Sequence, residues 1–212
     1  MENTENLKIE AENENCEKVK EINKKTKKKY EDLDIQKILM DTIHEVNKNK
    51  ETPTQKQKKW DRRYIELAKM VGSWSSCARP DRQVGSVIVR NKRIIATGYN
   101  GAPSGIMSCA ERGYCLREKL GIKSGTRAEV CFSTHSEQSA LMQAAKMGVA
   151  VDGATIYVTH RPCVICTKLI INAGIERIVY AYNYPDEFSI EMLRQANIEL
   201  VHLPDEKKDE KK

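Results

Sequence analysis

Residues 154–174 have the sequence ATIYVTHRPCVICTKLIINAG. The first six residues are mostly β-branched or aromatic, which is typical of a buried strand. After Pro162, apolar residues recur at helical spacing from Cys163 to Ala173, and Gly174 is suited to a left-handed C-cap. The stretch therefore predicts a strand that leads into a helix, which is the repeating unit of an α/β domain.

The same alternation extends along the chain on both sides of this stretch. Apolar spacing predicts three further helices and four further strands, over 60–74, 135–147 and 189–196, and over 84–89, 93–98, 177–182 and 198–203. Asn91-Lys92 predicts a tight turn, so the first two strands form an antiparallel hairpin. The later strands are reached through helices, which favours parallel pairing. We predict an α/β fold of three layers, α/β/α, with a five-stranded mixed sheet.

Composition divides the 212 residues into one domain and two charged tails. Residues 1–59 contain 14 lysines, 13 acidic residues and no glycine, so we expect a disordered tail. Within this tail, 33–47 has the spacing of a short amphipathic helix. We assign the folded domain to 60–203 and a second charged tail to 204–212. Inside the domain, a Gly-, Ser- and Pro-containing insertion over 99–131 has no clear periodicity.

Charge and hydropathy exclude several classes of protein. The net charge is +6 overall and +5 over 60–203, which is less than the dense basic stripe of a duplex-binding protein. Apolar runs are far shorter than the roughly 18–20 residues that cross a membrane. The first residues lack the basic and apolar regions of a secretory signal, so we expect a cytoplasmic protein.

The seven cysteines carry the main chemical information, because a reducing compartment favours metal ligation over disulfides. Cys163 and Cys166 lie at the start of a predicted helix, where two thiolates can share one metal ion. His135 begins another helix and would be a third ligand, which leaves one zinc position open for water. Glu137 is then suited to carry protons. The alternative is a packed histidine and a chance pair of thiols.

An H-x-E motif followed by P-C-x-x-C is the pattern of zinc-dependent base deaminases. Three segments, TGYNGAPSG (97–105), THSEQ (134–138) and GATIYVT (153–159), together with that motif resemble the deoxycytidylate (dCMP) deaminase family, including its competence-operon-type bacterial and archaeal members. The resemblance covers 60–203. It departs from the family at Ser136, where alanine is usual, and at Ser139, where asparagine is usual.

This resemblance implies a cytidine deaminase-like fold and the hydrolysis of dCMP to dUMP and ammonia by a zinc-bound hydroxide. His135, Cys163 and Cys166 would bind the catalytic zinc. Glu137 would be the catalytic proton carrier, and Asn100 would contact the sugar hydroxyl. The resemblance also implies a homo-oligomer and allosteric control by dCTP and dTTP.

Four further cysteines flank the hairpin and the insertion: Cys77, Cys109, Cys115 and Cys131. Four thiols are the full ligand set of a closed structural zinc, and such a site would order an irregular insertion. Some members of the family hold a second zinc in this region. The alternative is that these are buried free thiols, since free cysteine is often buried.

Substrate contacts are assigned by residue type alone. Arg79, Arg82 and Arg161 have the planar fork that suits a phosphate, although each is equally explained as a surface charge. Tyr184 follows a strand end and would line the pocket, unless it is simply packed.

Two other functions remain open. One is the deamination of a base within RNA, as tRNA adenosine deaminases perform with the same metal motif; inosine formation in tRNA would identify it. The other is a zinc-stabilised, competence-type accessory protein without turnover, which would bind zinc and convert no nucleotide.

Overall fold

The computed structural model describes residues 52–205, except 124, 125 and 128, together with five isolated positions, Glu17, Lys18, Glu21, Lys37 and Asp41. The chain divides into two units, Met1–Thr52 and Pro53–Lys212. In the first unit, the five isolated positions are helical and exposed. The helix predicted over 33–47 otherwise lies outside the described residues. The fold described below is that of the second unit.

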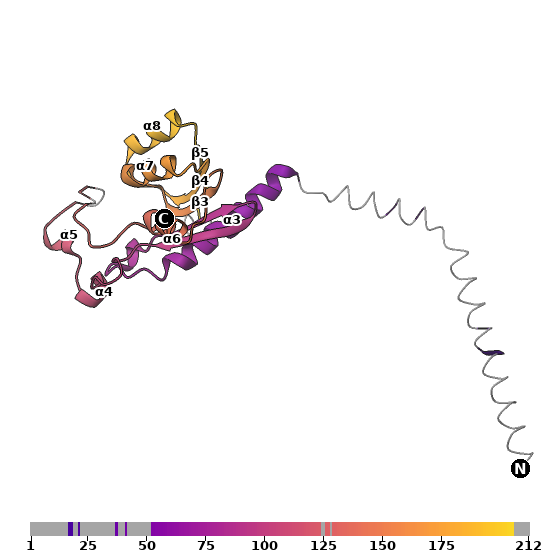
Figure 1. Ribbon diagram of the computed structural model, residues 1–212, viewed down its shortest axis with the longest axis horizontal. Helices are drawn as coiled ribbons and strands as arrows, with labels where there is room; N and C mark the ends of the chain where they lie inside the picture. Colours follow the sequence, from indigo (N-terminus) through magenta and orange to yellow (C-terminus); the bar gives the residue numbers. More distant parts are fainter. Residues whose placement is uncertain are drawn as a thin grey trace, which may run out of the picture. The chain divides into compact units, whose positions relative to one another are not determined.

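The second unit is built on a five-stranded mixed sheet with the order β2-β1-β3-β4-β5 (Figure 1). Its strands are β1 (Gly85–Arg90), β2 (Arg93–Tyr99), β3 (Thr155–His160), β4 (Arg177–Tyr182) and β5 (Glu199–His202). Strand β1 is antiparallel to both β2 and β3, whereas β3, β4 and β5 are parallel. The predicted hairpin and parallel pairing are confirmed.

Helices cover both faces of the sheet, which confirms the three-layer prediction. On one face, α3 (Pro53–Gly72) packs Tyr64 and Ala68 against Val87 of β1. On the other face, the buried cluster joins the sheet to α6 (Ser136–Lys146), α7 (Val164–Asn172) and α8 (Glu187–Gln195). Because successive side chains of a strand point to opposite faces, Ile88 joins the second cluster while Val87 joins the first.

Two local features hold β1 and β2 in place. Asn91 and Lys92 have φ values of 51° and 61°, as a type I′ hairpin turn requires, so the predicted turn is confirmed. Gly98 of β2 lies against the beginning of α6, where an added Cβ would be 2.3 Å from the carbonyl oxygen of Ser136. Only glycine allows this approach, which brings the start of α6 directly onto the sheet.

The folded unit extends beyond the predicted limits of 60–203. Helix α3 begins at Pro53, a residue suited to the first helical position, and its first turn carries no apolar periodicity that would predict it. Asp205, assigned to the C-terminal tail, accepts hydrogen bonds from Lys69 Nζ and Tyr182 Oη, both at 2.9 Å. Residues 206–212 lie outside the described part of the chain.

The insertion between β2 and α6 contains two short helices, α4 (Cys109–Arg112) and α5 (Leu116–Lys119), at one end of the sheet (Figure 1). Its ends are joined by two backbone hydrogen bonds between Gly101 and Thr134, of 2.9 and 3.3 Å. A further short helix, η1 (Pro80–Arg82), precedes β1. Within the described residues, no helix combines the length and the apolar character that crossing a membrane requires.

Candidate metal centre and active site

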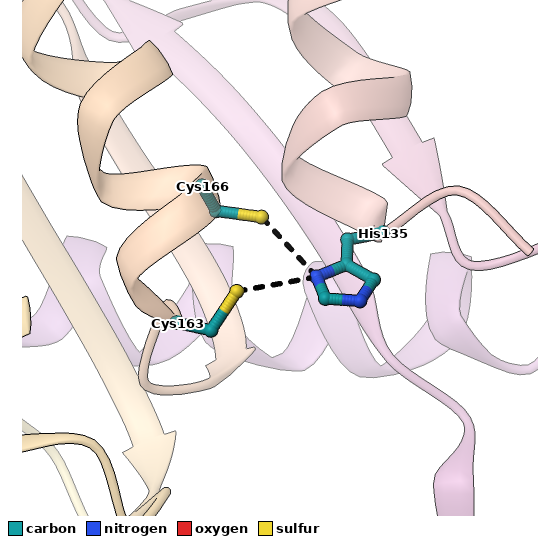
Figure 2. Close-up of side chains that lie close together, drawn as sticks. All are labelled: His135, Cys163 and Cys166. Atoms are coloured by element: carbon teal, nitrogen blue, oxygen red, sulfur yellow. Dashed lines mark hydrogen bonds between the residues drawn. The ribbon is translucent and has the colours of Figure 1, made fainter. Parts of the chain in front are cut away.

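The starts of two helices bring one imidazole and two thiols together. His135 is the N-cap of α6 and Cys163 is the N-cap of α7, with Cys166 in the first turn of α7. Figure 2 shows the three side chains pointing toward one another. His135 Nδ1 lies 3.3 Å from Cys166 Sγ and 3.5 Å from Cys163 Sγ.

These distances fit a tetrahedral zinc ion. Usual zinc–sulfur and zinc–nitrogen bond lengths place two ligands of one tetrahedron about 3.6 Å apart. All the donor atoms of the triad lie within 4.8 Å of one another, and no other group of three or more such ligands meets this limit in the described part of the chain. The triad fits a metal with one position left for water or substrate.

The electrostatics of the triad also favour a divalent cation. A hydrogen bond from Cys166 lowers the pKa of the Cys163 thiol to about 4, against the opposing effect of burial, and His135 lowers it further. The same contact with Cys163, together with burial, raises the pKa of Cys166. The contact with Cys163 raises the pKa of His135. The arrangement therefore favours the thiolate form of Cys163, which is the form that binds zinc.

Asp186 caps the start of α7, which leaves the Cys163 sulfur free to bind a metal. Its Oδ2 accepts from the backbone N–H of Val164 at 2.8 Å, while Oδ1 accepts from Ser189 N–H at 3.0 Å. One carboxylate therefore satisfies the N-termini of both α7 and α8. The Cys163 side chain makes no capping hydrogen bond of its own.

Glu137 lies beside the triad in a buried environment, with 4% of its surface exposed. Burial raises the pKa of its carboxyl, although the charge of His135 opposes the increase. A hydrogen bond with Glu137 contributes to the raised pKa of Cys166, so the carboxyl lies next to the sulfur. A carboxyl with a raised pKa next to a metal position is suited to accept and return protons.

Two buried serines orient this carboxyl. Ser136 Oγ donates to Glu137 Oε2 at 3.0 Å, and Ser136 Oγ lies 2.6 Å from Ser86 Oγ. Because Ser136 has a single hydroxyl proton, Ser86 is the donor in the second contact. The departure from alanine at position 136 therefore adds a support for Glu137.

The triad opens into a cavity that collects most of the residues assigned from the sequence. His135, Glu137 and Cys163 lie on its wall, together with Asn100, Arg79, Arg82, Arg161 and Tyr184. Cys166 is fully buried behind it. Two hydrogen bonds of 2.8 Å fix the Asn100 amide. Its Nδ2 donates to the backbone carbonyl of Arg82, and its Oδ1 accepts from the backbone N–H of Val84.

The arginines on the cavity wall are not equivalent. Arg79 lies between two carboxylates, those of Asp81 and Glu118, each at 2.9 Å. Arg161 donates to the backbone carbonyl of Tyr184 and contacts Glu187 at 3.4 Å.

The insertion contributes cavity residues that sequence reasoning missed. Arg117 and Ile122 line the cavity although neither belongs to a motif, and no periodicity marks them. They reach the site only because the insertion folds back between Gly101 and Thr134.

The four cysteines of the insertion region lie near one another without forming a closed ligand set. Cys77, Cys115 and Cys131 line the cavity, whereas Cys109 is buried. Burial raises the pKa of Cys77, and the other three thiols raise it further. Their sulfur atoms do not meet the distance limit that the His135 triad meets.

The family model of the cytidine and deoxycytidylate deaminase zinc-binding region matches residues 58–182. The chain belongs to this family. The resemblance found in the sequence motifs is therefore confirmed, as is the zinc-dependent character of this deaminase domain.

Comparison with individual proteins is consistent with this family membership. The chain is 38% identical over 141 residues to ComE operon protein 2 of Bacillus subtilis, covering 66% of this chain and 68% of that protein. It is 34% identical over 156 residues to deoxycytidylate deaminase of Schizosaccharomyces pombe, covering 73% of this chain and 47% of the relative, or about half its length. The dCMP deaminase of cyanophage S-TIM5, solved in complex with dCMP and dUMP, superposes with a TM-score of 0.55 at 30% identity, covering 73% of this chain and 100% of that one.

Proposed function

We propose that this protein hydrolyses dCMP to dUMP and ammonia. The observation that carries the proposal is the triad of His135, Cys163 and Cys166 with the Glu137 carboxyl beside it, open to one cavity. The names of the relatives support the choice of dCMP, and the structurally similar cyanophage enzyme binds dCMP and dUMP.

The metal and Glu137 have separate tasks in this reaction. Zinc held by His135, Cys163 and Cys166 supplies Lewis-acid chemistry, since it makes water a nucleophile at neutral pH. Glu137 accepts one proton of the attacking water and delivers it to N3 of cytosine. It then takes the proton of the hydroxyl added at C4 and gives it to the leaving amine, so that the C4 carbonyl and ammonia form. The serines behind Glu137 hold its carboxyl in one orientation through both transfers. Asn100 binds the sugar hydroxyl with the amide that the backbone of 82–84 holds in place.

The direct test is turnover of dCMP by the purified full-length chain loaded with zinc. We expect ammonia and dUMP to form in equal amounts, and dCMP to be a better substrate than cytidine or CMP. Dominant formation of inosine in tRNA would replace the proposal by RNA base deamination. Full zinc occupancy without conversion of any nucleotide would favour an accessory protein, the interpretation that the similarity to ComE operon protein 2 keeps open.

We also propose that Cys77, Cys109, Cys115 and Cys131 bind a second, structural zinc. Four thiols at the borders of the insertion are the full ligand set of a closed structural zinc, which supports this site. The sulfur atoms would have to move closer together to share the ion. We expect two zinc ions per wild-type chain by elemental analysis, and one in Cys109→Ser, because Cys109 does not line the catalytic cavity. Cys16→Ser is the matched control and keeps two zinc ions, because Cys16 lies in the charged segment 1–59 and belongs to neither cysteine set. One zinc per chain in the wild-type protein would contradict the second site.

The proposal extends to self-association, to control by dCTP and dTTP, and to a cytoplasmic location. Exposed apolar side chains on α6 and α7, including Met142 at 61% and Leu169 at 39%, support self-association. The need for reduced thiols at the metal site supports the location. Light scattering tests self-association, and deamination assays with and without dCTP or dTTP test the control. A monomer whose mass and activity neither triphosphate changes would contradict both proposals.

A further inference from the structure

A phosphate on the substrate needs a cationic partner inside the cavity, and four arginines line the cavity wall. Arg79 is neutralised by two carboxylates. Arg82 has Asp81 at 3.3 Å. Among the described residues, Arg117 is the member of this set with no carboxylate within 4 Å.

The hydrogen bonds of Arg117 leave part of its guanidinium free for a ligand. Its Nη2 donates to the backbone carbonyls of Lys123, at 3.1 Å, and Thr126. These two contacts fix the side chain without neutralising its charge. Its Nε is buried and has no hydrogen-bond partner in the described part of the chain. Buried N–H groups of this kind are normally paired, so the position favours an incoming acceptor.

Arg161 shares one of these features, since its Nε is also buried without a partner. It lies two residues from Cys163, at the metal end of the cavity, where the base must lie for its amine to be replaced. Arg117 comes from α5 in the insertion instead. Arg117 and Arg82 both lie close enough to the Tyr184 hydroxyl to oppose the increase in its pKa that burial causes. Arg117 also lines the cavity, so its positive charge is available to a ligand there.

We propose that Arg117 binds the 5′-phosphate of the substrate and thereby sets the preference for a nucleotide over a nucleoside. The inference rests on the proposed function and adds a residue that no motif identifies. A guanidinium offers phosphate a charged, forked donor set, and Glu118, the neighbouring acid, is held away by Arg79.

The experiment compares kcat/KM for dCMP with kcat/KM for deoxycytidine, which lacks only the phosphate. In Arg117→Met we expect the dCMP-to-deoxycytidine ratio to fall about 10- to 100-fold, mainly through KM for dCMP, as the loss of a charge-assisted contact implies. Arg117→Lys is expected to be intermediate, because it restores the charge but not the fork. Arg127→Met is the matched control. Arg127 belongs to the same insertion and pairs with Glu129 at 3.3 Å, but it does not line the cavity.

An unchanged ratio in Arg117→Met would overturn the inference. So would an equal loss on both substrates, because it would mean that Arg117 only orders the insertion through Lys123 and Thr126. A wild-type protein that converts neither substrate would refute the proposed function instead. Equilibrium dialysis of dCMP and deoxycytidine then still tests Arg117, because Arg117→Met must raise the Kd for dCMP relative to the Kd for deoxycytidine.

Discussion

Glu137→Gln is expected to lower kcat for dCMP deamination by about 100- to 10,000-fold, the range that a positioned general acid–base contributes. Glutamine keeps the size of the side chain and its acceptor for Ser136, but it cannot take up and return a proton at neutral pH. Because Glu137 is not part of the metal-binding triad, zinc content per chain should stay at the wild-type value. Stopped assays of dUMP formation, together with elemental analysis of the same preparation, measure both quantities.

The matched control for this prediction is Glu118→Gln, a carboxylate on the wall of the same cavity. Glu118 pairs with Arg79 and its side chain is 55% exposed, whereas Glu137 is buried. We expect Glu118→Gln to retain most of kcat. If Glu137→Gln kept more than a tenth of the wild-type rate, another group would have to carry the proton.

Much of this fold was predictable because its signals are local. The β-branched run of β1, the turn at Asn91-Lys92 and the glycine after α7 each lie within a few residues of the structure they specify. The early start of α3 at Pro53 was not predictable, since its first turn is polar and is specified by the fold rather than by periodicity. The two short helices of the insertion are too short to show a helical period. The start of α4 does carry a local signal, the capping box of Ser108 and Glu111.

The site residues also divide into those with a local sequence signal and those placed only by the whole fold. His135 and Cys163 could be linked because each begins a helix in a recognisable motif, and the structure brings their donor atoms together. The contact between Ser86 and Ser136 spans 50 positions and depends on the close approach that Gly98 permits. Arg117 could be assigned to the cavity only from the path that the insertion takes in the fold. The position of a side chain carried by an irregular segment depends on the whole fold, which a single sequence does not reveal.

A long-range ion pair between α3 and β4 also has no sequence signal. Arg177 donates two hydrogen bonds to the carboxylate of Asp61, at 2.9 and 2.8 Å, across 116 positions. Asp61 Oδ1 also accepts from Tyr157 Oη at 2.8 Å and from Gln57 Nε2 at 2.9 Å. The carboxylate is thus fully paired, with 2% of the residue exposed.

Asp61→Ala is expected to destabilise the domain by about 1–3 kcal/mol, because it leaves the buried Tyr157 hydroxyl without its acceptor and leaves Arg177 with only the exposed Glu199 carboxylate. For a domain of this size, the melting temperature should fall by roughly 2–12 °C. Thermal denaturation followed by circular dichroism, at equal zinc content, measures the change. The matched control is Glu191→Ala, which removes the partner of Arg194 from an exposed pair in α8 and should leave the transition nearly unchanged.

The same ion pair makes stability depend on pH with a definite sign. Burial alone would raise the pKa of Asp61, but the hydrogen bonds from Arg177, Tyr157 and Gln57 outweigh it and hold the pKa below the usual value. A carboxyl whose pKa is lower in the folded state contributes its full stabilisation above the unfolded value of about 3.9, and this is lost as the pH falls through the folded value. The difference in stability between wild type and Asp61→Ala should therefore be constant near neutrality and shrink below about pH 4. A difference that stayed the same down to acid unfolding would show that Asp61 stabilises the domain by packing rather than by its charge.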